Sequence, residues 1–251
     1  MEKENEMPVK KAQTNDTAED RGTRNNADLW RGGAKRLVII GLLLGILLFA
    51  GAGTTDWFRG WLFIALLVVT FSVNLVVMII KNPVLLRERW KRRKDTKDFD
   101  KVFGVIYLVS VLVMLVLAGA DAVRYQWSSM AASLVYPGAA LHFAGIIPVQ
   151  WSLVANPHLE TTVRIQTDRG HKVISRGPYR YVRHPMYVGV ILMFFGWPLI
   201  LGSWVALGIS CFIVCLLCVR THFEDRTLRS ELPGYTEFCR KTRYRLVPGL
   251  W

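Results

Sequence analysis

The chain has 251 residues, of which 52% are hydrophobic, and its formal net charge is +13. Its mean hydropathy is +0.27, and its apolar residues lie in long uncharged runs separated by short basic ones. A soluble domain mixes apolar and charged residues so that charges cover its surface. This segregation therefore excludes an ordinary soluble enzyme. The positive charge indicates membrane topology first and a polyanion-binding surface only second.

The first 36 residues are polar, of mixed charge and without a hydrophobic period. Such a segment buries too little apolar surface to offset the conformational entropy that folding removes. We therefore expect residues 1–36 to form a disordered tail. We expect no cleavable signal peptide, because the first apolar run begins too late.

Six apolar runs follow, and each approaches or exceeds the length that a helix needs to cross a hydrocarbon core of roughly 30 Å. They are residues 37–53, 57–80, 102–120, 130–151, 185–201 and 203–219. The last two are so close in sequence that we expect a tight antiparallel hairpin that turns at Gly202. The sequence predicts an all-α integral membrane protein with about six transmembrane helices, four of them within residues 37–151.

The basic residues predict the orientation of these helices. Of the 32 Lys and Arg residues, 30 lie in the two terminal segments and in the connections 81–101 and 152–184, whereas Arg59 and Arg124 lie near the other connections. Short cytoplasmic loops retain basic residues, and exported loops lack them. We therefore expect a multi-pass protein with both termini in the cytoplasm.

The basic cytoplasmic loop 81–101 is expected to act chiefly as a topology anchor. Binding of anionic lipid headgroups, or an interfacial helix, is the alternative. We expect no nucleic-acid partner, because no recognised binding module accompanies the charges.

Three of the four cysteines share one face of the last apolar run, at positions 211, 215 and 218, and Cys239 stands apart. No histidine or carboxylate occurs among them at ligand spacing, and cysteine packs well between membrane helices. We therefore expect neither a metal site nor a disulfide framework.

Polar residues without a topological role gather in the segment 156–187. Tyr179, Arg183 and His184 precede a predicted helix, and Pro185 suits the first turn of that helix. A helix N-terminus offers free N–H groups and partial positive charge, so this place can hold a carboxylate or another anion. Tyrosine rings would supply flat walls for a heteroaromatic or cationic group. An ordinary interfacial belt of Tyr and Arg is the alternative.

A second polar segment, residues 219–251, begins with Arg220 and Glu224 on one face of the last helix. Charges at a helix end within the membrane interface are costly unless they are paired or used. The spacing therefore indicates either a structural salt bridge between the two residues or a functional site.

Together these residues resemble the isoprenylcysteine carboxyl methyltransferase family and, more broadly, the integral-membrane phospholipid and protein methyltransferases that use S-adenosylmethionine. The resemblance covers roughly residues 156–251. It rests on GPYR at 177–180, RHPMYVG at 183–189, ED at 224–225, GY at 234–235 and RLVPG at 245–249. The tandem glutamates of the family appear here as Glu224 and Asp225.

The resemblance implies a catalytic region over residues 152–251 and a cytoplasmic cofactor pocket formed by the 152–187 segment, the last helical hairpin and the C-terminal tail. The cofactor would be S-adenosyl-L-methionine, and Arg220 would bind and orient a methyl acceptor that enters from the bilayer. That acceptor would be a prenylcysteine-like or other lipid-soluble carboxylate, or a phospholipid amine. Matching positions assign cofactor binding to Gln166, His171, Lys172, Val173, Ile174, Tyr179, His184, Pro185, Met186, Tyr187 and Glu224.

Two other functions stay open at this point. Membrane sterol and steroid reductases, which use NADPH, carry a similar Arg-His-x-x-Tyr stretch near the C-terminus. They typically have Asn and an acidic residue where this chain has Met186 and Val190, which favours the methyl donor. The other possibility is a non-catalytic membrane scaffold of the same fold. The presence together of His184, Arg220 and Glu224 disfavours it.

Overall fold

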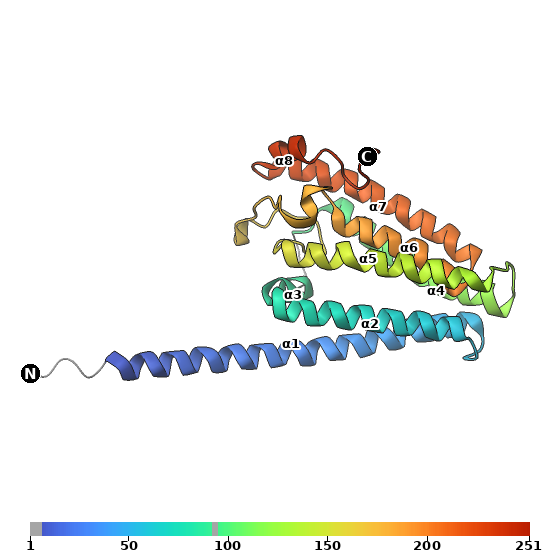
Figure 1. The fold of residues 1–251 in the computed structure, drawn as a ribbon, viewed down its shortest axis with the longest axis horizontal. Helices are drawn as coiled ribbons and strands as arrows, with labels where there is room; N and C mark the ends of the chain where they lie inside the picture. Colours follow the sequence, from blue (N-terminus) through green and yellow to red (C-terminus); the bar gives the residue numbers. More distant parts are fainter. Residues whose placement is uncertain (1–6, 92–94) are drawn as a thin grey trace, which may run out of the picture.

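The computed structural model describes residues 7–91 and 95–251, with side chains described from residue 26 onward. Within these ranges the chain forms helices and helical turns and no strand (Figure 1). The helices are α1 (Met7–Ala52), α2 (Phe58–Lys81), α3 (Pro83–Trp90), α4 (Asp98–Gly119), α5 (Val135–Ala155), α6 (Pro185–Leu201), α7 (Trp204–Glu231) and α8 (Tyr235–Lys241).

Five helices are long and apolar enough to span a membrane: α2, α7, α1 from Asn26 onward, and α4 and α5 with their adjoining turns. Helix α6 is a shorter apolar helix of 17 residues. The predicted all-α class is confirmed, and the chain is an integral multi-pass membrane protein. The expected span 185–201 corresponds to this shorter helix α6, and the expected span 203–219 lies almost entirely within α7.

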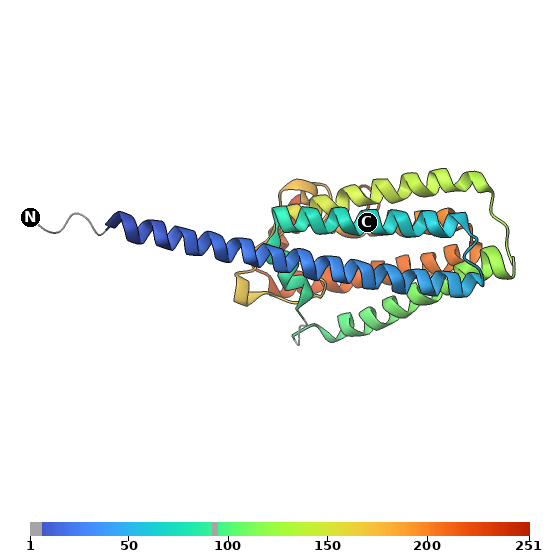
Figure 2. The same ribbon diagram turned by 90° about the horizontal axis from the view of Figure 1, so that it is seen from below.

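The polar segments gather at one end of the helical bundle. Helix α3, the connection between α5 and α6, and α8 lie at this end, and the turns that join α1 to α2 and α6 to α7 lie at the other (Figure 1). Helix α1 projects beyond the bundle at the polar end (Figure 2). Connections far apart in the sequence are thereby brought together at one end.

Helix α1 runs through most of the segment expected to be a disordered tail. Residues 1–6 lie outside the described residues, as do the side chains before residue 26. Leu29 is 4% exposed and packs in a core cluster with residues of α2 and α3. The guanidinium of Arg36 lies 3.9 Å from the centroid of the Trp90 ring in α3. The expected boundary at residue 36 is therefore too late, because this packing orders the helix from Leu29 onward.

Helices α5 and α6 pack backbone to backbone through two glycine pairs. A Cβ atom on Gly138 would lie 2.8 Å from the carbonyl oxygen of Gly196, and one on Gly145 would lie 2.5 Å from that of Gly189. Small residues let membrane helices approach closely without a hydrophobic driving force. This contact fixes the start of α6 against α5 at the polar end.

A buried histidine joins three of the spanning helices. The indole N–H of Trp197 donates to Nδ1 of His142 at 3.0 Å, and Nε2 of His142 lies 2.9 Å from the hydroxyl oxygen of Thr70. A neutral imidazole that accepts at Nδ1 carries its proton on Nε2 and donates it there. His142 therefore ties α5 to α2 and α6.

The hairpin between α6 and α7 turns at Gly202, as the sequence predicts, with a backbone φ of 83°. Arg59 of α2 donates to the carbonyl oxygens of Leu199 and Ile200 at 2.6 and 2.8 Å. Terminal helix carbonyls have no intrahelical partner and attract cations. Arg59, one of the two basic residues outside the segments expected to be cytoplasmic, thus caps the C-terminus of α6.

Helix α7 continues beyond residue 219, where its apolar run ends, and stops at Glu231. No glycine or proline interrupts it until Pro233 and Gly234. This polar extension carries Arg220, Glu224 and Asp225 to the polar end of the bundle.

Candidate active site

A cavity at the polar end encloses about 790 Å³, including its opening to solvent. Its walls come from the connection between α5 and α6, the start of α6, the polar extension of α7, and α8. Every residue that the sequence assigned to the cofactor or the acceptor lines this cavity. They are Gln166, His171, Lys172, Val173, Ile174, Tyr179, His184, Pro185, Met186, Tyr187, Arg220 and Glu224.

Further residues line the same cavity, and most of them lie outside the motifs quoted for the sequence. They include Asn156, His158, Leu228, Leu232, Tyr235 and Phe238. Leu228 follows Glu224 by four residues in α7, and this spacing is the signal that could have placed it on the same face.

Glu224 presents one free carboxylate oxygen to this cavity. The hydroxyl of Tyr187 donates to Oε2 at 2.6 Å, whereas Oε1 lies 3.9 Å from Nδ1 of His184. The Glu224 side chain is 18% exposed, and its hydrogen bond within the described residues involves Oε2, which leaves Oε1 for a ligand.

The imidazole of His184 stacks on the ring of Tyr187, with centroids 5.7 Å apart and planes at 2°. Its Nε2 is buried, and no hydrogen-bond partner for it lies in the described part of the chain. The nearest carboxylate oxygen, Oδ1 of Asp225, is 3.7 Å away. His184 therefore places Nδ1 next to Oε1 of Glu224, whereas its buried Nε2 faces Asp225.

Arg220 does not form the salt bridge with Glu224 that its spacing allowed. Its Nε donates to Asp100 of α4 at 2.7 Å, and its two terminal nitrogens donate to the Tyr187 hydroxyl at 2.6 Å and to the Thr161 carbonyl at 3.0 Å. The residue is 8% exposed. Removing one partner of such a buried pair typically costs about 3–5 kcal/mol, because it leaves an unpaired charge. Arg220 thus joins α4, α6 and α7 at one point.

The neighbouring Asp225 is fully buried and binds groups of the chain itself. The Nε atoms of Arg183, Arg229 and Arg245 donate to it at 2.8 to 3.1 Å, and the Tyr235 hydroxyl donates at 3.0 Å. The second acidic position therefore ties the start of α6 to α7, α8 and the C-terminal tail.

Arg183 was expected to help hold an anionic ligand, and its observed contacts contradict that role. Besides Asp225, its guanidinium donates to the carbonyl oxygens of Thr242 and Arg243 at 3.0 and 2.8 Å. Arg183 is only 5% exposed, and its guanidinium binds the C-terminal tail rather than a ligand.

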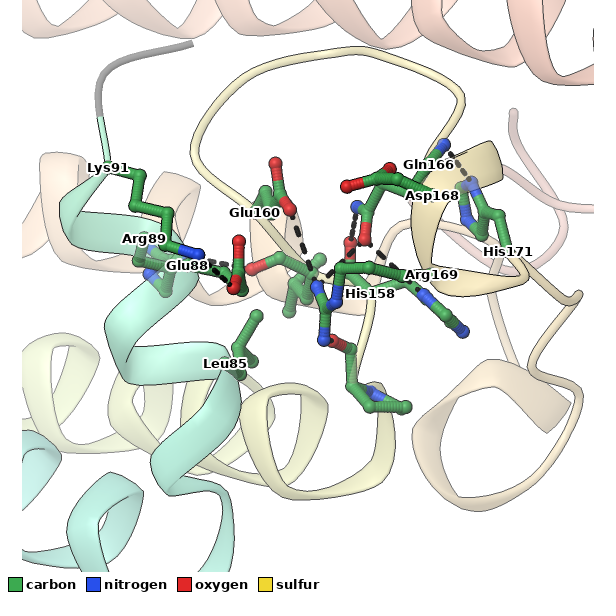
Figure 3. Close-up of polar contacts among 12 residues, drawn as sticks. Leu85, Glu88, Arg89, Lys91, His158, Glu160, Gln166, Asp168, Arg169 and His171 are labelled. Atoms are coloured by element: carbon green, nitrogen blue, oxygen red, sulfur yellow. Dashed lines mark hydrogen bonds and ion pairs between the residues drawn. The ribbon is translucent and has the colours of Figure 1, made fainter. Parts of the chain in front are cut away.

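Gln166 holds the connection between α5 and α6 in shape. Its amide oxygen accepts from Arg169 at 2.9 Å, and its amide nitrogen donates to the His158 carbonyl at 2.6 Å (Figure 3). Arg164 is paired with both Glu160 and Asp168 in the same loop. Gln166 lines the cavity, but both polar atoms of its side chain already have partners within the loop.

Two histidine rings of this loop lie 4.7 Å apart, those of His158 and His171. Burial, and then the positive charges of His158 and Arg164, lowers the pKa of His171 to about 4. Burial also lowers the pKa of His158. His171 is therefore neutral at pH 7 and adds no positive charge to the cavity.

A second, larger cavity lies among α2, α4, α5 and α6 and encloses about 1370 Å³, including its opening. Its walls are mainly apolar and include Phe71, Phe103, Tyr107, Val149, Val190, Met193 and Trp197. Thr162, Met186, Tyr187 and Arg220 line both cavities. The two cavities therefore adjoin at these four residues.

Comparisons with known proteins show which family and which fold this chain resembles. Residues 134–232 match the model of a family described as phospholipid methyltransferase. The fold is similar to that of the eukaryotic intramembrane Ras methyltransferase ICMT (isoprenylcysteine carboxyl methyltransferase), solved without a monobody. The likeness covers 82% of this chain and 74% of that chain, with 16% sequence identity and a TM-score of 0.51. The chain is thus an integral-membrane protein of the ICMT-like fold, and its residues 134–232 match the phospholipid methyltransferase family.

Proposed function

We propose that the protein transfers a methyl group from S-adenosylmethionine to a lipophilic acceptor at the membrane interface. The polar cavity would bind the cofactor, and the apolar cavity would bind the acceptor. The observation that carries this proposal is that the two cavities meet at Met186, Tyr187 and Arg220. A donor in one and an acceptor in the other would be in contact there, which is the alignment that group transfer requires.

The residues of the polar cavity fit this cofactor. Oε1 of Glu224 and Nδ1 of His184, which lie 3.9 Å apart, would supply polar atoms for the hydroxyl and ammonium groups of the ligand. Val173 and Ile174 supply apolar wall for the flat base. Pockets for such cofactors combine apolar walls with a few placed polar groups.

The bound cofactor supplies a methyl group on positively charged sulfur: a lone pair of the acceptor bonds to the methyl carbon while the carbon–sulfur bond breaks and its electrons pass to sulfur. A carboxylate acceptor becomes a methyl ester without releasing a proton, whereas an amine acceptor releases one. The chain needs only to align the acceptor and exclude water. Tyr187 and Arg220, hydrogen-bonded to each other at the junction, are placed for this task.

Arg220 retains its proposed role in orienting the acceptor, with one addition. Its hydrogen bond to Tyr187 continues to Glu224, so Arg220 also supports the cofactor cavity. From the sequence we expect Arg220→Ala to abolish methyl transfer and to leave cofactor affinity nearly intact. The hydrogen bonds through Tyr187 change the second expectation, and we now expect cofactor binding to weaken as well. The polar end would face the cytoplasm, as the distribution of basic residues indicates.

Calorimetric titration of the detergent-purified protein with S-adenosylhomocysteine and with NADPH tests the proposal. We expect the first ligand to bind and the second not to bind. Binding of NADPH alone would overturn the proposal in favour of a sterol-type reductase. Binding of S-adenosylhomocysteine without transfer of labelled methyl into extracted membrane lipid would favour a non-catalytic scaffold.

A further inference from the structure

Arg89 of α3 is a partly buried cation that lines the apolar cavity. Its guanidinium donates to the carbonyl oxygen of Leu159 at 2.7 Å, and no carboxylate pairs with it in the described ranges. Leu159 lines the polar cavity, so this contact places Arg89 beside both cavities. Figure 3 shows α3 next to the loop that carries Glu160 and Gln166. Burial lowers the pKa of Arg89 to about 10, which leaves it charged at pH 7.

Arg220, the other arginine in the wall of the apolar cavity, differs in this respect. Its three nitrogens are all bonded to groups of the chain, and its charge is balanced by Asp100. A guanidinium has five N–H donors, and Arg89 makes one described hydrogen bond. Of the three charged residues in this wall, Arg89 therefore has no carboxylate partner among the residues that the structure describes.

Two neighbouring groups in the same cavity also have polar atoms without partners. Thr162, with its hydroxyl oxygen, lines both cavities. Gln150, with its amide oxygen and nitrogen, lines the apolar cavity. All three atoms are buried, and the described residues offer none of them a hydrogen bond. Buried polar atoms are costly to leave unpaired, so their presence beside a free cation indicates a polar ligand group.

We propose that Arg89 binds an anionic group at the polar end of the acceptor and so restricts the apolar cavity to anionic amphiphiles. The inference rests on the proposed function, because it assigns the apolar cavity to the acceptor. A carboxylate or a phosphate would satisfy Arg89 in the same way, with Thr162 and Gln150 as additional hydrogen-bond partners. A neutral or cationic headgroup would leave the charge of Arg89 unpaired.

Matched brominated lipids test this inference on the full chain in nanodiscs of zwitterionic lipid. Dibromostearate and dibromostearamide share one tail and differ in headgroup charge, and bromine quenches tryptophan on contact. Trp197 in the cavity wall reports occupancy. Trp197→Phe identifies the quenching that arises there. We expect dibromostearate to bind at least about tenfold more tightly than the amide.

Three variants of α3 assign the preference to one side chain. Arg89→Gln should weaken dibromostearate binding about tenfold or more and leave the amide unchanged, and Arg89→Lys should retain part of the preference. Arg87→Gln removes the same charge from the same helix but at a position outside the cavity wall, so it should change neither. Stearyl phosphate, added as a competitor, then distinguishes the two anions: stronger displacement than by stearate identifies a phosphate site, and weaker displacement a carboxylate site.

Equal affinity of the wild-type protein for the two probes would overturn the inference, as would unchanged dibromostearate binding by Arg89→Gln. Titration of the same samples with S-adenosylhomocysteine separates this failure from failure of the proposed function. Cofactor binding without charge preference would refute the anion site alone. Charge preference without cofactor binding would refute the proposed reaction and leave the anion site standing.

Discussion

The two cavities are built in different ways. The polar cavity is enclosed by a loop, a helix start and the C-terminal tail, which ion pairs such as those of Asp225 hold together. The apolar cavity is enclosed by spanning helices, which glycine contacts and the His142 hydrogen bonds hold together. The first depends on a few specific side chains, and the second on shape. Substitutions should therefore damage the two cavities separately.

The largest effect should follow from Asp225→Ala. The change leaves three guanidinium groups and the Tyr235 hydroxyl without their common partner, and the free energy of unfolding should fall by about 3–5 kcal/mol. The measurement is the midpoint of thermal unfolding in detergent. Asp98→Ala is the matched control, since Asp98 is exposed and pairs with Lys101 alone. An equal and small shift in both variants would show that Asp225 does not assemble the polar end.

Glu224→Gln, at the position next to Asp225, should weaken cofactor binding without lowering the stability of the fold. Glutamine can still accept the hydrogen bond from Tyr187, so the unfolding midpoint should stay near that of the wild type. Loss of the charged oxygen should weaken S-adenosylhomocysteine binding about tenfold to hundredfold, the usual range for a hydrogen bond to a charged group. Calorimetry measures both this variant and Glu237→Gln, which changes an exposed carboxylate outside the cavity. The proposed role of Glu224 fails if the two variants bind alike.

Val190→Trp should damage only the apolar cavity. The larger side chain would fill space in the wall of this cavity, so transfer of labelled methyl into membrane lipid should fall about tenfold while S-adenosylhomocysteine affinity is kept. Leu192→Trp introduces the same side chain on α6 at a position that lines neither cavity. Reduced cofactor affinity in Val190→Trp would contradict the separation of the two cavities.

The sequence predicted the start and end of α6. Pro185 begins this helix as expected, and Gly202 turns the following hairpin. These are local signals, set by backbone conformation and by one helical turn. The residues proposed to bind the cofactor came instead from the family resemblance, and they line one cavity although Glu224 lies far from the others in the chain.

Partners that lie far apart in the sequence could not be predicted in this way. Arg220 binds Asp100, which is 120 residues earlier, and no local pattern indicates that pairing. The ion pair between Arg183 and Asp225, 42 residues apart, likewise could not be predicted. Nor could the position of Arg89, because the sequence does not distinguish it from the other basic residues of its loop. The apolar cavity likewise has no motif, because aliphatic and aromatic residues in a spanning helix look the same whether they face lipid or a ligand.

The smallest effect that we predict concerns the loop that bounds the polar cavity. Burial and neighbouring positive charges hold the pKa of His171 at about 4 in the folded protein, below the value of about 6.5 expected in the unfolded chain. Between these two values the unfolded chain binds the additional proton, so folding stability should decrease as the pH falls from 6.5 towards 4. Above pH 6.5 the histidine is neutral in both states and contributes no pH dependence. The unfolding midpoint should therefore drop more between pH 7 and pH 5 in the wild type than in His171→Gln, whereas His222→Gln, at an exposed position, should follow the wild type. If His171→Gln lost as much stability on acidification as the wild type did, another group would be responsible, and the neutral state of the loop at pH 7 would need a different explanation.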